Sequence, residues 1–230
     1  MILSKTREIP NLSIKMNGVP LKACNSYKYL GVMIDKDLEW GPHIDYISKK
    51  ISKACGALAK LRYCVSMDML KNVYHALIHS YLRYGILVWG NAPQTTLDPL
   101  RVLVNKSVRI IANLPFGSVE LDPVFKELKL LRLHKIHKLE TGKFLFKEKN
   151  CLLPTRIGNN FEVTSNQIPH DHFVRHERSP RFICNSQTGK KSVQFNAMQL
   201  WNNIPTEFKS IDSFKVFKRT YKKYLINGDD

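Results

Sequence analysis

The sequence predicts an α+β fold that is mostly α, in which a small N-terminal antiparallel β element precedes a helical bundle and a loop-rich helical C-terminal region. Alternation of apolar and polar residues, which is typical of strands, is found in residues 1–40, and "RFICN" at 181–185 is a further strand candidate. After residue 40 apolar residues recur every three or four positions, which is a helical period. Pro, Gly, Asn and Ser interrupt this period at about 150–190. We therefore expect regions 1–40, 41–115 and 116–230.

Two stretches carry the strand signals. Apolar and polar residues alternate at 12–21 around Asn17-Gly18, which predicts a β-hairpin. The run "YKYLGVMI", residues 27–34, is apolar on both faces and predicts a third strand covered on both sides. Three strands would form only a thin sheet with exposed edges.

Helical stripes follow from Trp40 onward. The first runs to about Leu61, and Ser66 can cap a second whose apolar positions include Leu77 and Tyr81. Asp122-Pro123 is typical of a helix start. The predicted helices span about 40–61, 97–113, 122–149, 192–203 and 210–226, and one from 66 that fades at "WGNAP", residues 89–93.

The net charge of +17, from 36 Lys and Arg against 19 Asp and Glu, is the outlying property of the composition. Such an excess indicates a polyanionic partner, with nucleic acid favoured over a membrane surface. A basic but inert surface remains the alternative. The excess is concentrated in the first predicted helix and in residues 101–149 and 171–225.

Cysteine usage and hydropathy indicate the cellular compartment in which the chain is expected. The five Cys are odd in number and form no CxxC pair, which predicts a reduced intracellular chain, nuclear or cytoplasmic. No apolar leader is seen at the N-terminus, and no uncharged apolar run approaches the roughly 18 residues of a membrane span. We therefore expect no membrane partner.

Three acids, Asp35, Asp37 and Glu39, follow the apolar run at 27–34. A two-metal site uses carboxylates that converge from separate strands, whereas these three are local. Turn and helix-start chemistry is the better interpretation. We assign no catalytic residue.

Two patterns of metal ligands are weak. His170, His172, His176 and Cys184 offer the ligand types of zinc, but no second Cys lies close by. His43-Ile44-Asp45 matches the H-x-D pair of iron oxygenases, but it lies in a helical pattern and not on a strand. We therefore predict neither a metal site nor a cofactor in this chain.

Five stretches in a fixed order resemble one family. They are "NGVPLKACNSYKYLGVMIDKDLEWGPHIDYISKKI", "VYHALIHSYLRYGILVWGN", "VNKSVRIIANLP", "LKLLRLHKIHKLETGKFLFK" and "LWNNIPTEFKSIDSFKVFKRTYKKYL". Together they are similar to the C-terminal part of reverse transcriptases from jockey-type non-LTR retrotransposons. The resemblance implies that 1–40 is the end of the palm, 41–115 a thumb-like domain and 116–230 a basic C-terminal region.

The family's catalytic aspartates lie in a Y-x-D-D turn and an earlier palm strand, and both precede the part that this chain resembles. The resemblance therefore implies a truncated RNA-directed DNA polymerase segment that binds template-primer nucleic acid and is inactive alone. The parent polymerase would need Mg²⁺. The expected partners are an RNA/DNA template-primer duplex and the missing palm and fingers segment, if that is made as a separate fragment.

The resemblance also implies site residues. Tyr29, Leu30 and Gly31 would form a primer-grip-like strand, in which the glycine permits close backbone approach. Basic residues would contact phosphates without reading sequence. These are Lys49, Lys50, Lys53, Arg101, Lys106, Arg109, Arg175, Arg178, Arg181, Lys190 and Lys191.

Two alternatives stay open. In the first, the chain is a helical protein-interaction module that a host has retained, and its apolar faces contact other proteins. In the second, the segment Tyr27 to Tyr63 resembles the N-terminal domain of AlkB-homologue tRNA-modifying proteins, which would bring methyltransferase or oxygenase activity. Nothing in the sequence supplies an active site for that chemistry.

Overall fold

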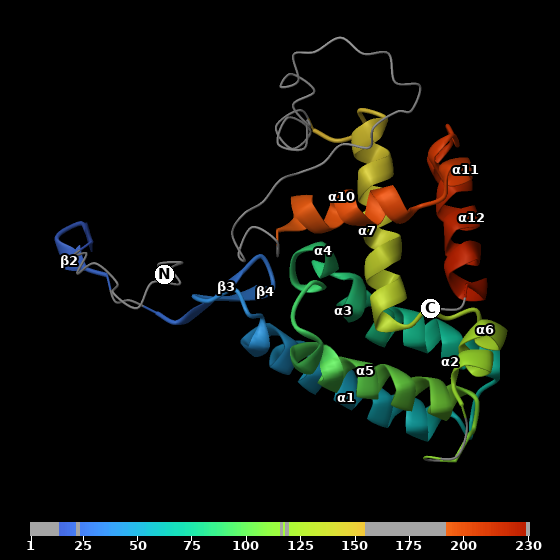
Figure 1. Ribbon diagram of the computed structural model, residues 1–230. Coiled ribbons are helices and arrows are strands. Elements are labelled where there is room, and N and C mark those ends of the chain that lie inside the picture. The colour runs from blue at the N-terminus through green and yellow to red at the C-terminus, as the bar shows by residue number, and fades with distance from the viewer. Residues whose placement is uncertain (1–13, 22–23, 116, 118–119, 155–191, 229–230) are drawn as a thin grey trace, which may run out of the picture. The chain divides into compact units, whose positions relative to one another are not determined.

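The computed structural model describes residues 14–21, 24–115, 117, 120–154 and 192–228, and the strand candidate at 181–185 lies outside them. Small antiparallel strand pairs precede a helical remainder, which confirms an α+β fold that is mostly α (Figure 1). The chain divides into two compact units. Met1–Gly85 with Ala92–Leu121 forms unit 1, and Ile86–Asn91 with Asp122–Asp230 forms unit 2. Among the described residues, no helix is both long and apolar enough to cross a bilayer.

The first hairpin of unit 1 joins β1 (Lys15–Met16) to β2 (Val19–Pro20). Its turn has positive φ at both central residues, 51° at Asn17 and 81° at Gly18. A two-residue turn of this kind matches the twist of the strands that it connects. The hairpin predicted at 12–21 is therefore confirmed, although its strands are short and exposed.

The single strand predicted at 27–34 is wrong, because this run forms a second hairpin. β3 (Ser26–Tyr29) pairs antiparallel with β4 (Val32–Asp35), and Tyr29 faces Val32 across the turn. Leu30 has a φ of 46° and Gly31 a φ of 83°, so the chain reverses between them. Tyr27 and Tyr29 are exposed, and the predicted cover on both faces is therefore also wrong.

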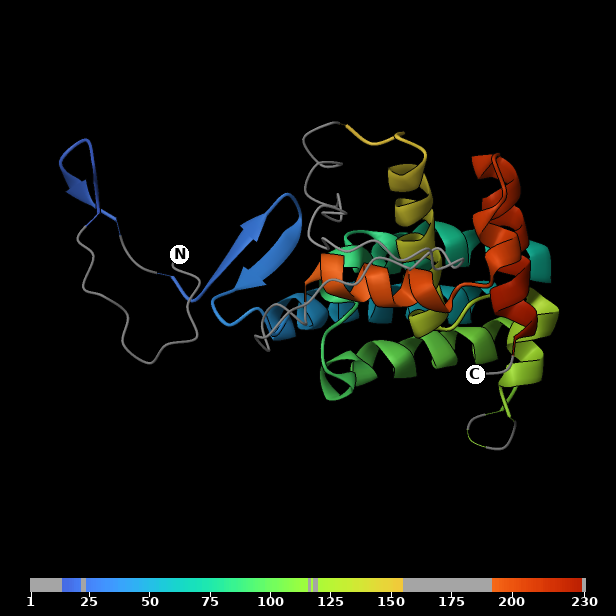
Figure 2. The same cartoon turned by 45° about the horizontal axis from the view of Figure 1, so that its top comes forward.

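The helices of unit 1 pack around α1 (Gly41–Leu61) and α5 (Gln94–Ile111), which lie side by side (Figure 2). Their apolar stripes are buried as predicted. On α1 these include Ile44, Ile47, Ile51 and Leu58, and on α5 they are Leu97, Leu100, Val104, Val108 and Ile111. This packing leaves the polar faces of both helices outward.

The second predicted helix contains a π-helical turn. It runs as α2 (Met67–Tyr74), η1 (His75–His79) and α3 (Ser80–Arg83). The wider π turn favours residues four apart on one face. The buried row is Leu70, Tyr74, Ile78 and Leu82, whereas Leu77 and Tyr81, expected on the apolar side, are exposed.

Unit 2 is helical among its described residues. It contains α4 (Ile86–Trp89), α6 (Asp122–Leu128), α7 (Leu133–Lys149), α10 (Val193–Asn203), α11 (Thr206–Lys209) and α12 (Phe214–Asn227). α4, α10 and α12 all pack on α7. In this core the rings of Phe146 and Phe217 stack with centroids 4.6 Å apart. A Cβ on Gly142 would lie 2.7 Å from the Tyr221 ring, so glycine allows this close contact.

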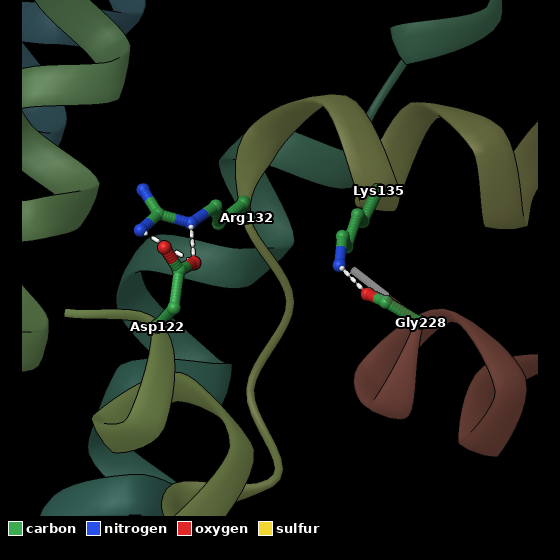
Figure 3. A network of polar contacts seen from close by, with 4 residues as sticks. All are labelled: Asp122, Arg132, Lys135 and Gly228. Carbon is green, nitrogen blue, oxygen red and sulfur yellow. Dashed lines mark hydrogen bonds and ion pairs between the residues drawn. The ribbon is translucent and has the colours of Figure 1, made fainter. Parts of the chain in front are cut away.

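The single helix predicted at 122–149 is also wrong, because it breaks at Lys129. This residue has a φ of 57°, and the Leu130 N–H bonds to the Phe125 carbonyl, which is a Schellman ending. Asn113 after α5 and Cys151 after α7 occupy the same left-handed position. Beyond the break, Arg132 forms an ion pair with Asp122, and Lys135 donates to the Gly228 carbonyl (Figure 3).

Candidate nucleic-acid interface

The tip of the β3–β4 hairpin holds the three predicted primer-grip-like residues. Tyr29 ends β3, and Leu30 and Gly31 form the turn, where Leu30 is 73% exposed. The Tyr84 hydroxyl donates a hydrogen bond to the Leu30 carbonyl, and a Cβ on Gly31 would lie 3.3 Å from the Tyr84 ring. Tyr84 therefore fixes an exposed turn to the helical part of unit 1.

The base of the same hairpin is fixed by Asp35. Its carboxylate accepts the Glu39 N–H at 2.8 Å and the Trp40 N–H at 2.9 Å, and the residue is only 8% exposed. Trp40 has a φ of 67° and directly precedes α1. Asp35 thus satisfies backbone donors of the turn that precedes α1, which confirms the turn interpretation for this acid, whereas no side chain caps the helix itself.

His43 fixes the outer edge of β4. Its Nδ1 accepts the Met33 N–H at 3.3 Å, and its side chain is buried. Burial lowers the pKa of His43 to about 4, so the imidazole is neutral near pH 7 and can accept this hydrogen bond. This nitrogen of the H-x-D motif is therefore engaged by the backbone. Within the described part of the chain, no three His, Cys, Asp or Glu side chains gather as metal ligands.

A basic cluster lies where β3 meets α1. Lys28 donates to the Tyr46 hydroxyl at 3.3 Å, and its Nζ is 4.9 Å from the centre of that ring. Lys50 approaches the same ring at 5.8 Å. Both contacts are cation–π geometries. The ring of Tyr46 thus brings together a lysine from the hairpin and a lysine from the helix.

The predicted lysines of α1 continue this cluster. Lys49, Lys50 and Lys53 are exposed and are spaced three, four and seven residues after Tyr46, so they share one helix face. We call Lys28, Tyr46, Lys49, Lys50 and Lys53 the α1 basic face.

The predicted cations of α5 differ in whether a polar group of the protein already contacts them. Arg101 forms an ion pair with Asp98 at 2.9 Å, and Arg109 donates to the Pro115 carbonyl at 3.0 Å. Lys106 is exposed, and its charge partly opposes the burial that raises the pKa of the Cys55 thiol on α1. Lys106 is therefore better placed for phosphate than the two arginines.

The remaining predicted site residues lie outside the described residues. These are Arg175, Arg178, Arg181, Lys190 and Lys191, together with the zinc candidates His170, His172, His176 and Cys184. Conversely, sequence reasoning missed Lys28 and Tyr84. Only the contact of Lys28 with an aromatic residue 18 positions later, and of Tyr84 with a turn 54 positions earlier, reveals them.

Comparison with known proteins supports a reverse transcriptase-like segment. The chain is 28% identical over 134 residues to the RNA-directed DNA polymerase from mobile element jockey of Drosophila melanogaster, covering 56% of this chain and 14% of that protein. It is 34% identical over 114 residues to the jockey polymerase of Drosophila funebris, covering 48% and 12%. A probable RNA-directed DNA polymerase from transposon BS of Drosophila melanogaster is 28% identical over 115 residues, covering 49% and 13%.

The matched part is therefore a small fraction of each of these relatives. No family model matches the chain, and no solved structure matches it. The predicted resemblance to jockey-type polymerases is confirmed for about half of the chain.

Proposed function

We propose that this chain is the template-primer-binding segment of a retrotransposon RNA-directed DNA polymerase. The observation that carries the proposal is the α1 basic face lying beside a hairpin whose exposed turn is anchored by Tyr84. The polymerase names of the similar proteins support the same assignment.

In this proposal the two parts of unit 1 have different roles. The lysines of the α1 basic face contact phosphates, which positions a duplex without reading its sequence. The turn at Tyr29, Leu30 and Gly31 meets the end of the primer. Because Tyr84 holds the turn and packs where a Gly31 side chain would lie, nucleic-acid backbone can approach a surface that is already ordered.

Nucleotide addition depends, in this proposal, on carboxylates outside the segment. Asp35 is committed to two backbone N–H groups of the turn before α1, and it is buried. We therefore assign polymerase chemistry, with its Mg²⁺, to a palm and fingers segment that acts together with this chain. Purified alone, the chain should not extend a primer, and nucleotide incorporation would contradict the proposal.

A salt series with a labelled RNA/DNA duplex tests the binding role. The slope of log affinity against log salt should fall by about 1 for each phosphate that the protein no longer neutralises. We expect the pair Lys49→Gln and Lys53→Gln to lower the slope by about 2. The matched control pair, Lys15→Gln and Lys129→Gln, removes two exposed lysines elsewhere and should change it little.

The salt series distinguishes the proposed nucleic-acid-binding role from the alternative of a protein-interaction module. An unchanged slope in the Lys49 and Lys53 variant would overturn the α1 basic face as a phosphate contact. Weak wild-type binding that is also insensitive to salt would favour the helical protein-interaction module instead.

A further inference from the structure

α12 carries an unusual concentration of charge in unit 2. Its 14 residues, Phe214–Asn227, include five cations and no acid. The cations are Lys215, Lys218, Arg219, Lys222 and Lys223. Phe217, Tyr221 and Leu225 are the buried residues of the same helix. The helix is therefore divided into a core side and a positively charged side.

The five cations share one face. At about 100° per residue they fall within an arc of about 140°, whose centre is about 130° from that of the buried residues. Four of them are exposed, and Lys222 is half-buried. The apolar side packs on α7, where Phe217 stacks on Phe146 and Tyr221 lies against Gly142. This packing fixes the direction in which the charged face points from the helix.

This charge is not neutralised by the described part of the protein. Elsewhere in unit 2, Lys143 pairs with Glu140 at 2.6 Å and Arg132 pairs with Asp122 at 2.7 Å. By contrast, no described carboxylate forms an ion pair with a cation of α12. Burial, together with the charge of Lys218, lowers the pKa of Lys222. The like charges therefore repel one another in the free protein, and a bound anion would relieve that repulsion.

We propose that the charged side of α12 is a second nucleic-acid contact surface, which binds the phosphate backbone independently of unit 1. From Lys215 to Lys223 the helix rises about 12 Å. One DNA strand presents a phosphate about every 3.4 Å along its axis, so the face spans three to four phosphates. The surface lies in the second unit and goes beyond the role proposed for the α1 basic face.

Two features favour nucleic acid over a lipid surface or a protein as the partner of this face. A helix that lies on a lipid surface buries its apolar face among the acyl chains, but the apolar face of α12 is already in the core of unit 2. A protein interface usually has an apolar centre, whereas the arc of cations carries a single apolar residue, Ile226, at its C-terminal end. A backbone of regularly spaced phosphates needs only the row of charges.

The test uses the full chain and changes four exposed positions together. The neutral variant carries Lys215→Gln, Lys218→Gln, Arg219→Gln and Lys223→Gln. The matched control carries Lys215→Arg, Lys218→Arg, Arg219→Lys and Lys223→Arg, so it alters the same positions and keeps the charge. Thermal unfolding of both should match the wild type, because all four side chains are exposed.

Affinity for labelled single-stranded RNA and for an RNA/DNA duplex is then measured across a salt series. We expect the neutral variant to lower the slope of log affinity against log salt by about 3 to 4 on at least one nucleic acid, while the control keeps it. Unchanged binding of both nucleic acids would overturn the proposal. Weaker binding only to vesicles of anionic phospholipid, tested in parallel, would overturn it as well.

The Lys49 and Lys53 variant separates this inference from the proposed function. If α12 contacts nucleic acid and the α1 basic face does not, only the α12 variant has a reduced salt dependence. The reverse result would refute the α12 surface and leave the proposed function intact.

Discussion

The two hairpins of unit 1 have nearly the same turn but different surroundings. Their central φ values are 51° and 81° in the first hairpin and 46° and 83° in the second. Both strands of the first hairpin are exposed, whereas the second is held at its tip by Tyr84, at its edge by His43 and at its base by Asp35. A two-residue turn is therefore enough to shape a hairpin, but contacts from distant residues fix its position.

This difference concerns function directly, because only the second hairpin carries residues of the proposed primer site. A surface that binds with little ordering cost must be held in place before its ligand arrives. Four measurements test whether these contacts distinguish the second hairpin from the first.

Replacing Asp35, the acid at the base of the second hairpin, should reduce stability the most. Asp35→Ala leaves the buried Trp40 N–H and the part-buried Glu39 N–H without their acceptor, and a fully buried group of this kind costs about 1–3 kcal/mol. We expect the free energy of unfolding to fall by about 2–4 kcal/mol in urea titrations. Asp37→Ala, two residues further on, is the control and should stay within about 0.5 kcal/mol. Equal losses from both substitutions would contradict the role given to Asp35.

Acid should weaken the second hairpin through His43. Its folded-state pKa of about 4 lies below the unfolded value of 6.5, so the unfolded chain binds more protons between these limits. The stability from neutral His43 is complete above about pH 6.5 and disappears as the pH falls towards 4. We expect a decrease on the order of 2 kcal/mol from this group in urea titrations over that range.

His43→Asn supplies the comparison for the acid effect, because the amide oxygen can still accept a hydrogen bond but does not titrate in this range. Its stability should depend less steeply on pH between 6.5 and 4 than that of the wild type. His137 in unit 2, whose pKa burial also lowers to about 4, contributes a similar slope in both proteins. Identical pH profiles would show that His43 is not the source.

Alanine at the turn glycine should destabilise the protein more in the second hairpin than in the first. Gly31→Ala meets both an unfavourable φ and the Tyr84 ring at 3.3 Å, and we expect a destabilisation of about 1–2 kcal/mol. Gly18→Ala has a similar φ but no atom within 4 Å, and its hairpin is exposed. Its effect on global unfolding should be below about 0.5 kcal/mol. A larger effect at Gly18 would reverse the comparison.

Removing the hydroxyl at the tip should have the smallest effect. Tyr84→Phe keeps the ring beside Gly31 and removes only the hydrogen bond to the Leu30 carbonyl, which is worth about 1 kcal/mol. Amide hydrogen exchange should quicken at residues 26–35 and stay unchanged at 15–20. Uniform acceleration in both hairpins would indicate a general decrease in stability, and not a loosened tip.

The features that the sequence can predict are those whose signals are local. Asn17-Gly18 is a strong hairpin signal and predicts the first hairpin, whereas Leu30-Gly31 is a weak one, so the pattern predicts a single strand where the second hairpin lies. The stripes of α1 and α5 follow a regular period, which makes them predictable. The π turn and the break at Lys129 carry no Gly or Pro, so nothing local marks them.

The candidate site divides in the same way. Exposed lysines at helical spacing, such as Lys49 and Lys53, can be found from the chain alone. Lys28 and Tyr84 depend on contacts across 18 and 54 residues, and only the folded chain brings them to the site. The sequence also could not show that Arg101 and Arg109 already have partners.

The left-handed helix endings described for Asn113, Lys129 and Cys151 have a practical consequence. None of the three is glycine, although glycine adopts this conformation without the penalty of roughly 1 kcal/mol that a Cβ brings. Lys129 and Cys151 are both exposed, and they belong neither to the α1 basic face nor to the cations of α12. Glycine at these two positions would give a more thermostable form for biochemical work, with both basic surfaces unaltered.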